Sequence, residues 1–286
     1  MTTPHGIQIE SVSLQGGNEM PMVGFGTWRM GEDASEAHNE IEALQHAYDR
    51  GFRHFDTAEM YGSGGSERVL GEALAEVPRG ELFVTSKFYP YNAGRADMAS
   101  ACAASLDRLA MDYLDLYLLH WPGSTPIQET LAGAEDLLSQ GLIRSFGISN
   151  FDAASIAEMR AAGLTDRIAV NQVLYNPARR GIEFDLLPLM QEIGMICVAY
   201  TPIEPHRIGA NAAFADVARQ AGLSPAQLAL AWQVTRGVTC PIPKSATKAN
   251  IDALADAVGT PLSPETLAAI DEACPPPTQP QPLETL

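Results

Sequence analysis

Residues 113–123 read YLDLYLLHWPG, an almost continuous apolar run from Leu114 to Leu119 that ends at His120. Strands of a parallel sheet that are buried on both faces have this pattern. Seven other short runs of β type occur in the chain, and amphipathic helical patterns separate them. The eight candidate strands span residues 23–28, 53–57, 82–87, 114–120, 145–149, 169–174, 196–200 and 239–243.

The segments between these strands have the spacing of helices with one apolar face, and glycines such as Gly51, Gly141 and Gly194 stand where the helices should end. Eight strands, each with at least one helix before the next, predict right-handed crossovers and a closed (β/α)8 TIM barrel. An open doubly wound sheet is the alternative that periodicity leaves. The expected helices span residues 35–50, 66–74, 96–109, 127–140, 152–162, 182–193, 212–220, 225–235, 248–257 and 264–273.

The two ends of the chain are expected to add to this barrel without forming a second domain. Residues 7–14 and 21–23 flank Gly16 and Gly17, which predicts a hairpin that plugs one end of the barrel. Residues 275–286 are rich in proline and cannot build a core, so we expect this tail to lie on the surface. Residues 1–286 are therefore interpreted as one domain.

Composition excludes several classes of function. The chain of 286 residues has 18 Lys and Arg against 35 Asp and Glu, a net charge of −17, which argues against nucleic-acid and anionic-membrane partners. We find no apolar run of about 20 residues and no secretory signal. The cysteines have neither metal-ligand nor disulfide spacing, which indicates reduced thiols in a cytoplasmic protein. These cysteines are Cys102, Cys197, Cys240 and Cys274.

Polar, chemically capable residues end the predicted strands. Catalytic groups of a βα barrel lie at these carboxyl ends and in the loops just after them. Tyr61 follows Asp56 by five residues in a glycine-rich loop, so it should reach the same mouth of the barrel. The residues at the strand ends are Trp28, Asp56, Lys87, His120, Asn150, Gln172, Tyr200 and Lys244.

Four of these residues form a coherent set for carbonyl reduction. The tyrosine pKa of about 10 is too high for an efficient acid at neutral pH, and a lysine ammonium beside Tyr61 would lower it. A carboxylate, Asp56, would keep the Lys87 ammonium charged and oriented. His120 can donate a hydrogen bond to a carbonyl oxygen as negative charge develops there. Each residue alone also fits an ordinary structural role, but the four together favour delivery of a hydride to an aldehyde or ketone.

The chain resembles the aldo-keto reductases over essentially its whole length. The segment GFRHFDTAEMYGSGGSERVLGEAL (51–74) is similar to the family segment with the Asp and the Tyr, LFVTSKFYP (82–90) to that with the Lys, and YLDLYLLHWPG (113–123) to that with the His. MGEDAS (30–35) and GIEFDLLP (181–188) recur in bacterial members that reduce methylglyoxal and similar aldehydes. Further matches, in order, are GLIRSFGISNF (141–151), NQVLYNP (171–177), VAYTPI (198–203) and PIPKS (241–245).

The resemblance implies a role for each of these residues. Tyr61 would be the general acid, Lys87 and Asp56 would tune it, and His120 would orient the carbonyl. It implies an NADPH cofactor and no metal, and the substrate pocket would be lined by Trp28, Tyr89, His120 and Trp121. The cofactor would be held by Thr27, Trp28, Asp56, Ser149, Asn150, Gln172, Tyr200, Thr201, Pro202, Ile203, Lys244, Ser245 and Asn250.

The sequence departs from the family pattern where the adenosine 2′-phosphate should bind. Asn250 stands in place of the usual Arg and cannot form a bidentate charge-assisted pair. We therefore expect NADPH use through Lys244, Ser245 and Lys248, with NADH also accepted and weak discrimination between the two.

Two loops near the expected site also differ. Glu204 would face the pyrophosphate unfavourably unless it points away, and His206 or Arg207 is expected to compensate its charge. Only about six residues separate Trp121 from the next helix, which predicts an open, shallow pocket for varied small carbonyls.

The main prediction is thus a cytoplasmic, monomeric reductase of small aldehydes, dicarbonyls and ketones. A cofactor-binding redox sensor or regulatory subunit on the same fold is the alternative from another class. A barrel hydrolase is disfavoured, because no metal-ligand cluster or activated nucleophile ends the strands.

Overall fold

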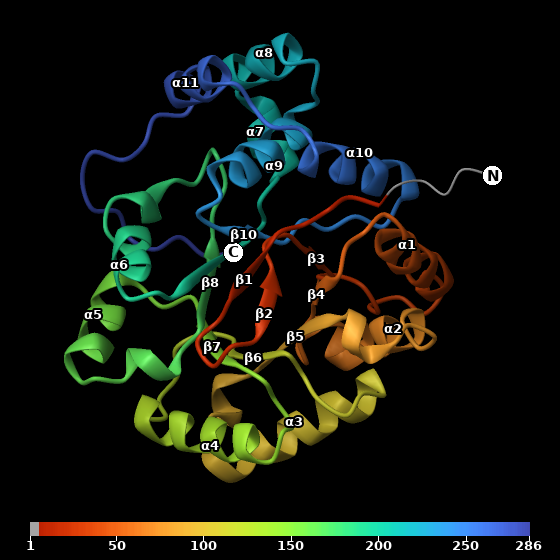
Figure 1. The fold of residues 1–286 in the computed structure, drawn as a ribbon, viewed down its shortest axis with the longest axis vertical. Coiled ribbons are helices and arrows are strands. Elements are labelled where there is room, and N and C mark those ends of the chain that lie inside the picture. Colours follow the sequence, from red (N-terminus) through yellow and green to blue (C-terminus); the bar gives the residue numbers. More distant parts are fainter. Residues whose placement is uncertain (1–5) are drawn as a thin grey trace.

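Eight parallel strands form the centre of the molecule in the computed structural model, which describes residues 6–286 (Figure 1). Their spatial order follows the sequence without interruption, from β3 to β10. The Gly26 amide donates to the Pro243 carbonyl at 2.8 Å and joins the two outer strands of the sheet, so the barrel is nearly closed. The predicted TIM barrel is confirmed, and the open sheet is excluded. The strands are β3 (Gly24–Gly26), β4 (His54–Asp56), β5 (Phe83–Phe88), β6 (Leu116–Leu119), β7 (Phe146–Ser149), β8 (Val170–Leu174), β9 (Ile196–Tyr200) and β10 (Cys240–Pro241).

Helices surround the barrel, and most lie where the apolar spacing predicts them (Figure 1). Side-chain caps fix several of their starts: Asp152 accepts from the Ser155 amide at 2.8 Å, and Ser224 forms a capping box. The short helix α7 (Pro205–Ala210) escaped prediction because its six residues have no apolar period to detect. The others are α1 (Ala37–Asp49), α2 (Gly65–Ala73), α3 (Arg95–Leu109), α4 (Ile127–Ser139), α5 (Ala153–Ala161), α6 (Leu186–Glu192), α8 (Ala212–Gln220), α9 (Pro225–Arg236), α10 (Lys248–Val258) and α11 (Pro264–Ala273).

A hairpin closes the amino-terminal end of the barrel, as expected. Strands β1 (Ser11–Ser13) and β2 (Glu19–Pro21) pair antiparallel, and the second begins two residues earlier than predicted. Gly16 and Gly17 turn the chain with φ of +97° and +85°, which strains any other residue. Leu14 and Met20 pack against the inward-facing Leu116, Leu118 and Val170, so the hairpin seals the barrel floor.

The tail, residues 275–286, contains no helix or strand and is mostly exposed. It runs from α11 past α6 and returns toward the centre of the barrel (Figure 1). Leu283 packs against the main core, and Leu286 lies at the barrel mouth. Among the helices of residues 6–286, none is long and apolar enough to cross a membrane.

Candidate active site

A cleft of about 460 Å³ opens at the carboxyl ends of the barrel strands. Fourteen of the residues singled out from the sequence line it. The remaining four do not: Lys87 is buried below it, and Tyr89, Ser245 and Asn250 lie outside. The lining residues that were expected are Thr27, Trp28, Asp56, Tyr61, His120, Trp121, Ser149, Asn150, Gln172, Tyr200, Thr201, Pro202, Ile203 and Lys244.

Asp56, Lys87 and Tyr61 are connected in a chain of polar contacts at the floor of the cleft. The Lys87 ammonium donates to Asp56 Oδ1 at 2.5 Å, to the Thr57 carbonyl at 2.9 Å and to the Tyr61 hydroxyl at 3.3 Å. Lys87 and Asp56 are 0% and 1% exposed. Strands β4 and β5 are direct neighbours in the barrel, which brings the carboxylate and the ammonium together.

Burial and charge act in opposite directions on these groups. Burial alone would lower the pKa of Lys87, but the Asp56 carboxylate and the Tyr61 hydroxyl raise it, so the ammonium persists. Burial raises the pKa of Tyr61, and the Lys87 ammonium opposes this rise without cancelling it. The expected net lowering of the Tyr61 pKa is therefore not observed. Lys87 acts in the expected direction, but loss of water around the hydroxyl has the larger effect.

His120 faces Tyr61 across the floor of the cleft. Their rings are 5.8 Å apart between centroids, with an interplanar angle of 75°. Burial, with a smaller contribution from the Lys87 ammonium, lowers the pKa of His120 to about 3. The imidazole is therefore neutral at physiological pH and can donate one hydrogen bond. Its Nδ1 is buried without a hydrogen-bond partner among the described residues, so this nitrogen can still form a hydrogen bond.

A connected polar wall continues from this floor along β7, β8 and β9. The Gln172 amide donates to Asp56 Oδ2 at 2.8 Å, and the Ser149 hydroxyl donates to the Gln172 carbonyl at 2.8 Å. Asn150 has a left-handed φ of 62°, which turns the chain so that its amide donates to the His120 carbonyl at 3.1 Å and accepts from the Tyr200 hydroxyl at 2.9 Å. These contacts orient amide and hydroxyl groups toward one small volume.

Aromatic residues form the rim on the side of His120. Trp28, 44% exposed, and Trp121 both line the cleft. Tyr89 lies behind Trp121, with its ring edge-on at 5.7 Å, and stacks on Tyr91 at 4.8 Å. Tyr89 thus supports the wall of the cleft without being part of it.

Two cations, Lys244 and Arg29, also line the cleft, and the Arg29 guanidinium lies over the Trp28 ring, 4.7 Å from its centroid. Within residues 6–286, neither Lys244 nor Arg29 forms an ion pair with a carboxylate. Burial lowers the pKa of Lys244, and Glu40 and the more weakly acting Glu32 partly offset this. The sequence analysis missed Arg29, although its position next to the strand-end Trp28 was a usable signal.

The expected phosphate-binding segment is only partly directed toward the cleft. Ser245 is nearly buried and accepts from the Thr247 amide at 3.2 Å, and Asn250 is exposed on the first turn of α10. Lys248 is engaged elsewhere, because its ammonium donates to Glu42 on α1 at 2.8 Å.

Glu204 lines the cleft, but its charge is compensated by a residue that the sequence analysis did not consider. Arg179 donates to both carboxylate oxygens, at 2.9 and 3.1 Å, and Asn176 donates to one of them at 3.0 Å. Of the two expected partners, Arg207 contributes only a weaker electrostatic effect that lowers the Glu204 pKa, and Arg179 has the main role. Arg179 lies 25 residues away in sequence and becomes a neighbour only through the barrel.

Among residues 6–286, no three His, Cys, Asp or Glu side chains gather into a metal-binding group.

Comparison with known proteins agrees with the resemblance seen in the sequence. The model of the aldo/keto reductase family matches residues 22–274. Methylglyoxal reductase YeaE of Escherichia coli (strain K12) is 43% identical over 276 residues, which cover 95% of this chain and 97% of the relative. Glyoxal reductase of Bacillus subtilis (strain 168) is 34% identical over 267 residues, which cover 92% of each chain.

Solved structures extend this agreement to the fold. The crystal structure of an aldo-keto reductase from Klebsiella pneumoniae in complex with NADPH has a TM-score of 0.92 and 38% identity, covering 98% of this chain and 100% of that one. A second structure, with NADP and acetate, has the same values. The chain therefore belongs to the aldo/keto reductase family and is an oxidoreductase.

Proposed function

We propose that this protein reduces small aldehydes, dicarbonyls and ketones to alcohols with NADPH, and that Tyr61 is the general acid. The observation that carries this proposal is the contact chain from Asp56 through Lys87 to the Tyr61 hydroxyl, with the neutral His120 facing it. A proton donor and a hydrogen-bond donor that converge on one point suit a carbonyl oxygen that becomes an alkoxide.

The cleft has the groups that a phosphorylated nicotinamide cofactor needs. Lys244 and Arg29 offer positive charge without carboxylate partners in a chain of net charge −17, and this is the chemistry that phosphates require. Ser149, Asn150 and Gln172 would hold the nicotinamide carboxamide, and Tyr200 would lie against the ring. The relatives of known structure from Klebsiella pneumoniae contain NADPH or NADP. When bound, the cofactor would supply the hydride.

The residues of the chain would handle the carbonyl oxygen. The His120 imidazole would donate a hydrogen bond that orients this oxygen, and the Tyr61 hydroxyl would transfer its proton to it. Lys87 would stabilise the resulting phenolate, and Asp56 would hold the ammonium in place. A positioned acid of this kind contributes about 10²–10⁴-fold to a rate.

Small dicarbonyls such as methylglyoxal fit the proposal best. The cleft of about 460 Å³ must hold both the nicotinamide end of the cofactor and the substrate, and Trp28 and Trp121 narrow its rim. The similar proteins named for methylglyoxal and glyoxal reduction support this class. The proposed enzyme is a monomer, because one barrel supplies all four residues assigned to the reaction.

Substitution of Tyr61 by Phe tests the proposal. Oxidation of NADPH with methylglyoxal, followed by absorbance of the reduced nicotinamide, should fall by about 10²–10⁴-fold, because the proton donor is lost. NADPH affinity, measured by quenching of protein fluorescence, should stay within about twofold, because the hydroxyl is not a phosphate ligand. Tyr91→Phe, at an exposed position outside the cleft, is the matched control and should keep full activity. A wild-type protein that binds NADPH but turns over no carbonyl would favour the sensor alternative.

A further inference from the structure

Arg179 lies between two segments that are far apart in the sequence. Its guanidinium binds Glu204 through two hydrogen bonds and also donates to Glu284 of the tail. Arg179 and Glu204 are 15% and 18% exposed, whereas Glu284 is 44% exposed. The same cation is thus shared by two carboxylates, which follow it in the sequence by 25 and 105 residues.

Both segments continue into the walls of the active-site cleft. Glu204 belongs to the loop after β9, and Thr201 to Pro205 line the cleft on the side proposed for the cofactor. Glu284 is two residues before Leu286, which lines the same cleft together with Tyr200 and Trp121. Arg179 does not line this cleft, so it acts on the cleft only through its two partners.

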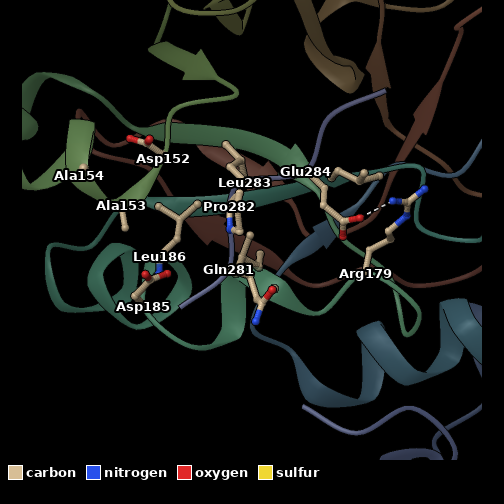
Figure 2. Close-up of a pocket in the computed structure, with 13 residues that line it drawn as sticks. Asp152, Ala153, Ala154, Arg179, Asp185, Leu186, Gln281, Pro282, Leu283 and Glu284 are labelled. Carbon is tan, nitrogen blue, oxygen red and sulfur yellow. Dashed lines mark hydrogen bonds and ion pairs between the residues drawn. The ribbon is translucent and has the colours of Figure 1, made fainter. Parts of the chain in front are cut away.

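The tail has few other attachments near this point. Gln281 passes closely over Gly181, where an added Cβ would lie 3.2 Å from the Gln281 Cβ, and Leu283 packs on the core. Figure 2 shows the tail lying across residues at the starts of α5 and α6, with Glu284 directed toward Arg179. A cavity of about 170 Å³ remains beneath it. Packing here is incomplete, so residues 284–286 are restrained by polar contacts: the ion pair of Glu284 with Arg179 and a backbone hydrogen bond from Leu286 to Tyr200.

The electrostatic environment favours this arrangement. Burial alone would raise the pKa of Glu204, but the hydrogen bonds from Arg179 and Asn176 lower it, so the carboxylate stays charged. The hydrogen bond to Glu204, despite partial burial, raises the pKa of Arg179. Arg179 is therefore a permanent cation between two anions.

We propose that Arg179 is a positioning residue that fastens residues 281–286 to the 201–205 loop, so that Leu286 forms an apolar wall of the substrate pocket. This inference rests on the proposed carbonyl reduction. The wall adds apolar contact in proportion to the size of the substituent on the carbonyl. The fastening thus adds affinity for dicarbonyls with a larger apolar group and has little effect on methylglyoxal.

Glu284→Gln tests the fastening without removing a buried charge. Loss of this partly exposed ion pair should raise the KM for phenylglyoxal about three- to fivefold. The KM for methylglyoxal should change less than about twofold, and kcat should hold for both, because in the proposal Leu286 would contact only the larger substituent. Glu272→Gln removes an equal charge from an exposed position on α11 and should change neither KM. Equal KM changes for the two substrates would overturn the proposal.

Amide hydrogen exchange separates this inference from the proposed activity. In the protein without cofactor or substrate, Glu284→Gln should speed exchange in a peptide covering residues 281–286. Arg179→Met should speed it there and also in a peptide covering residues 201–205. Unchanged exchange in both variants would contradict the proposal that Arg179 fastens the tail, even if the enzyme reduces methylglyoxal. If the wild type reduces no carbonyl, the proposed function fails, while faster exchange in the variants would still support the restraint.

Discussion

Charged groups occur both at the floor of the cleft and at its rim, but in different surroundings. At the floor, Lys87 and Asp56 are almost completely buried and fixed by neighbouring strands. At the rim, Arg179 joins loop and tail residues whose carboxylates are 18% and 44% exposed. At the floor, the low dielectric strengthens the ion pair and rigid strands fix the positions of its side chains. At the rim, water screens the ion pairs and weakens them. We therefore expect the reaction chemistry to depend on the floor, and selection among substrates and cofactors to depend on the rim.

The largest effect is expected at the floor, from Lys87→Met. Asp56 would be left buried without its cation, and removal of one partner of a buried pair costs about 3–5 kcal/mol of unfolding free energy. The reduction rate should fall by about 10²-fold or more, because Tyr61 loses the ammonium that stabilises its phenolate. Urea unfolding and steady-state kinetics measure the two effects.

Arg160→Met provides the contrast on the surface. Arg160 and Glu192 form an ion pair that is 45% and 60% exposed, so both stability and activity should hardly change. If the two variants lost equal stability, the distinction between the buried pair of the floor and exposed ion pairs would be wrong.

The pH dependence of reduction tests the protonation states of His120 and Tyr61 at the floor. With a pKa of about 3, His120 stays neutral at pH values both below and above the ordinary histidine pKa. The kcat/KM should therefore vary less than about twofold between about pH 5 and 9. Tyr61 must be protonated to act as the acid, and burial raises its pKa, so activity should decline only above about pH 10. An acidic decline centred near the ordinary histidine pKa would contradict this environment for His120.

The smallest effect is expected at the cofactor end of the rim, from Glu42→Gln. This change frees Lys248 from its exposed ion pair and makes its ammonium available to a 2′-phosphate. The Kd for NADPH should fall by up to about fivefold, and the Kd for NADH should not change, because NADH lacks this phosphate. Glu36→Gln, on the exposed start of the same helix, is the control and should affect neither cofactor.

The wild-type preference between cofactors bears on the same region. With Asn250 on α10 and Lys248 paired, NADPH should be preferred by less than about a thousandfold in kcat/KM. A larger preference would show that other groups, such as Arg29, supply the discrimination.

Much of the fold was predictable because its signals are local. Several barrel strands are short apolar runs, such as β6 (LYLL), and each of the eight was placed correctly in type. Boundaries moved by a few residues where hydrogen bonds at the ends decide them, as in β10, which is only Cys240–Pro241. The hairpin followed from Gly16 and Gly17, but α7 has no amphipathic period and was missed.

The arrangement of the polar groups was predictable to the extent that it depends on strand ends. The convergence of Asp56, Tyr61 and His120 on the cleft and the position of Lys87 beneath it follow from barrel topology. The position of Tyr89 was not predictable in this way: Trp121 lines the cleft, and Tyr89 packs edge-on against it.

The sequence by itself determined the barrel, its family and the identity of the four residues proposed for carbonyl reduction, because strand periodicity and ordered motifs are properties of neighbouring residues. Only the tertiary structure decided that Arg179 binds Glu204 and Glu284 and that Lys248 forms an ion pair with Glu42. It also decided that burial raises the pKa of Tyr61 more than the Lys87 ammonium lowers it. These features depend on the distance between remote side chains and on the exclusion of water, and neither is encoded in any short segment.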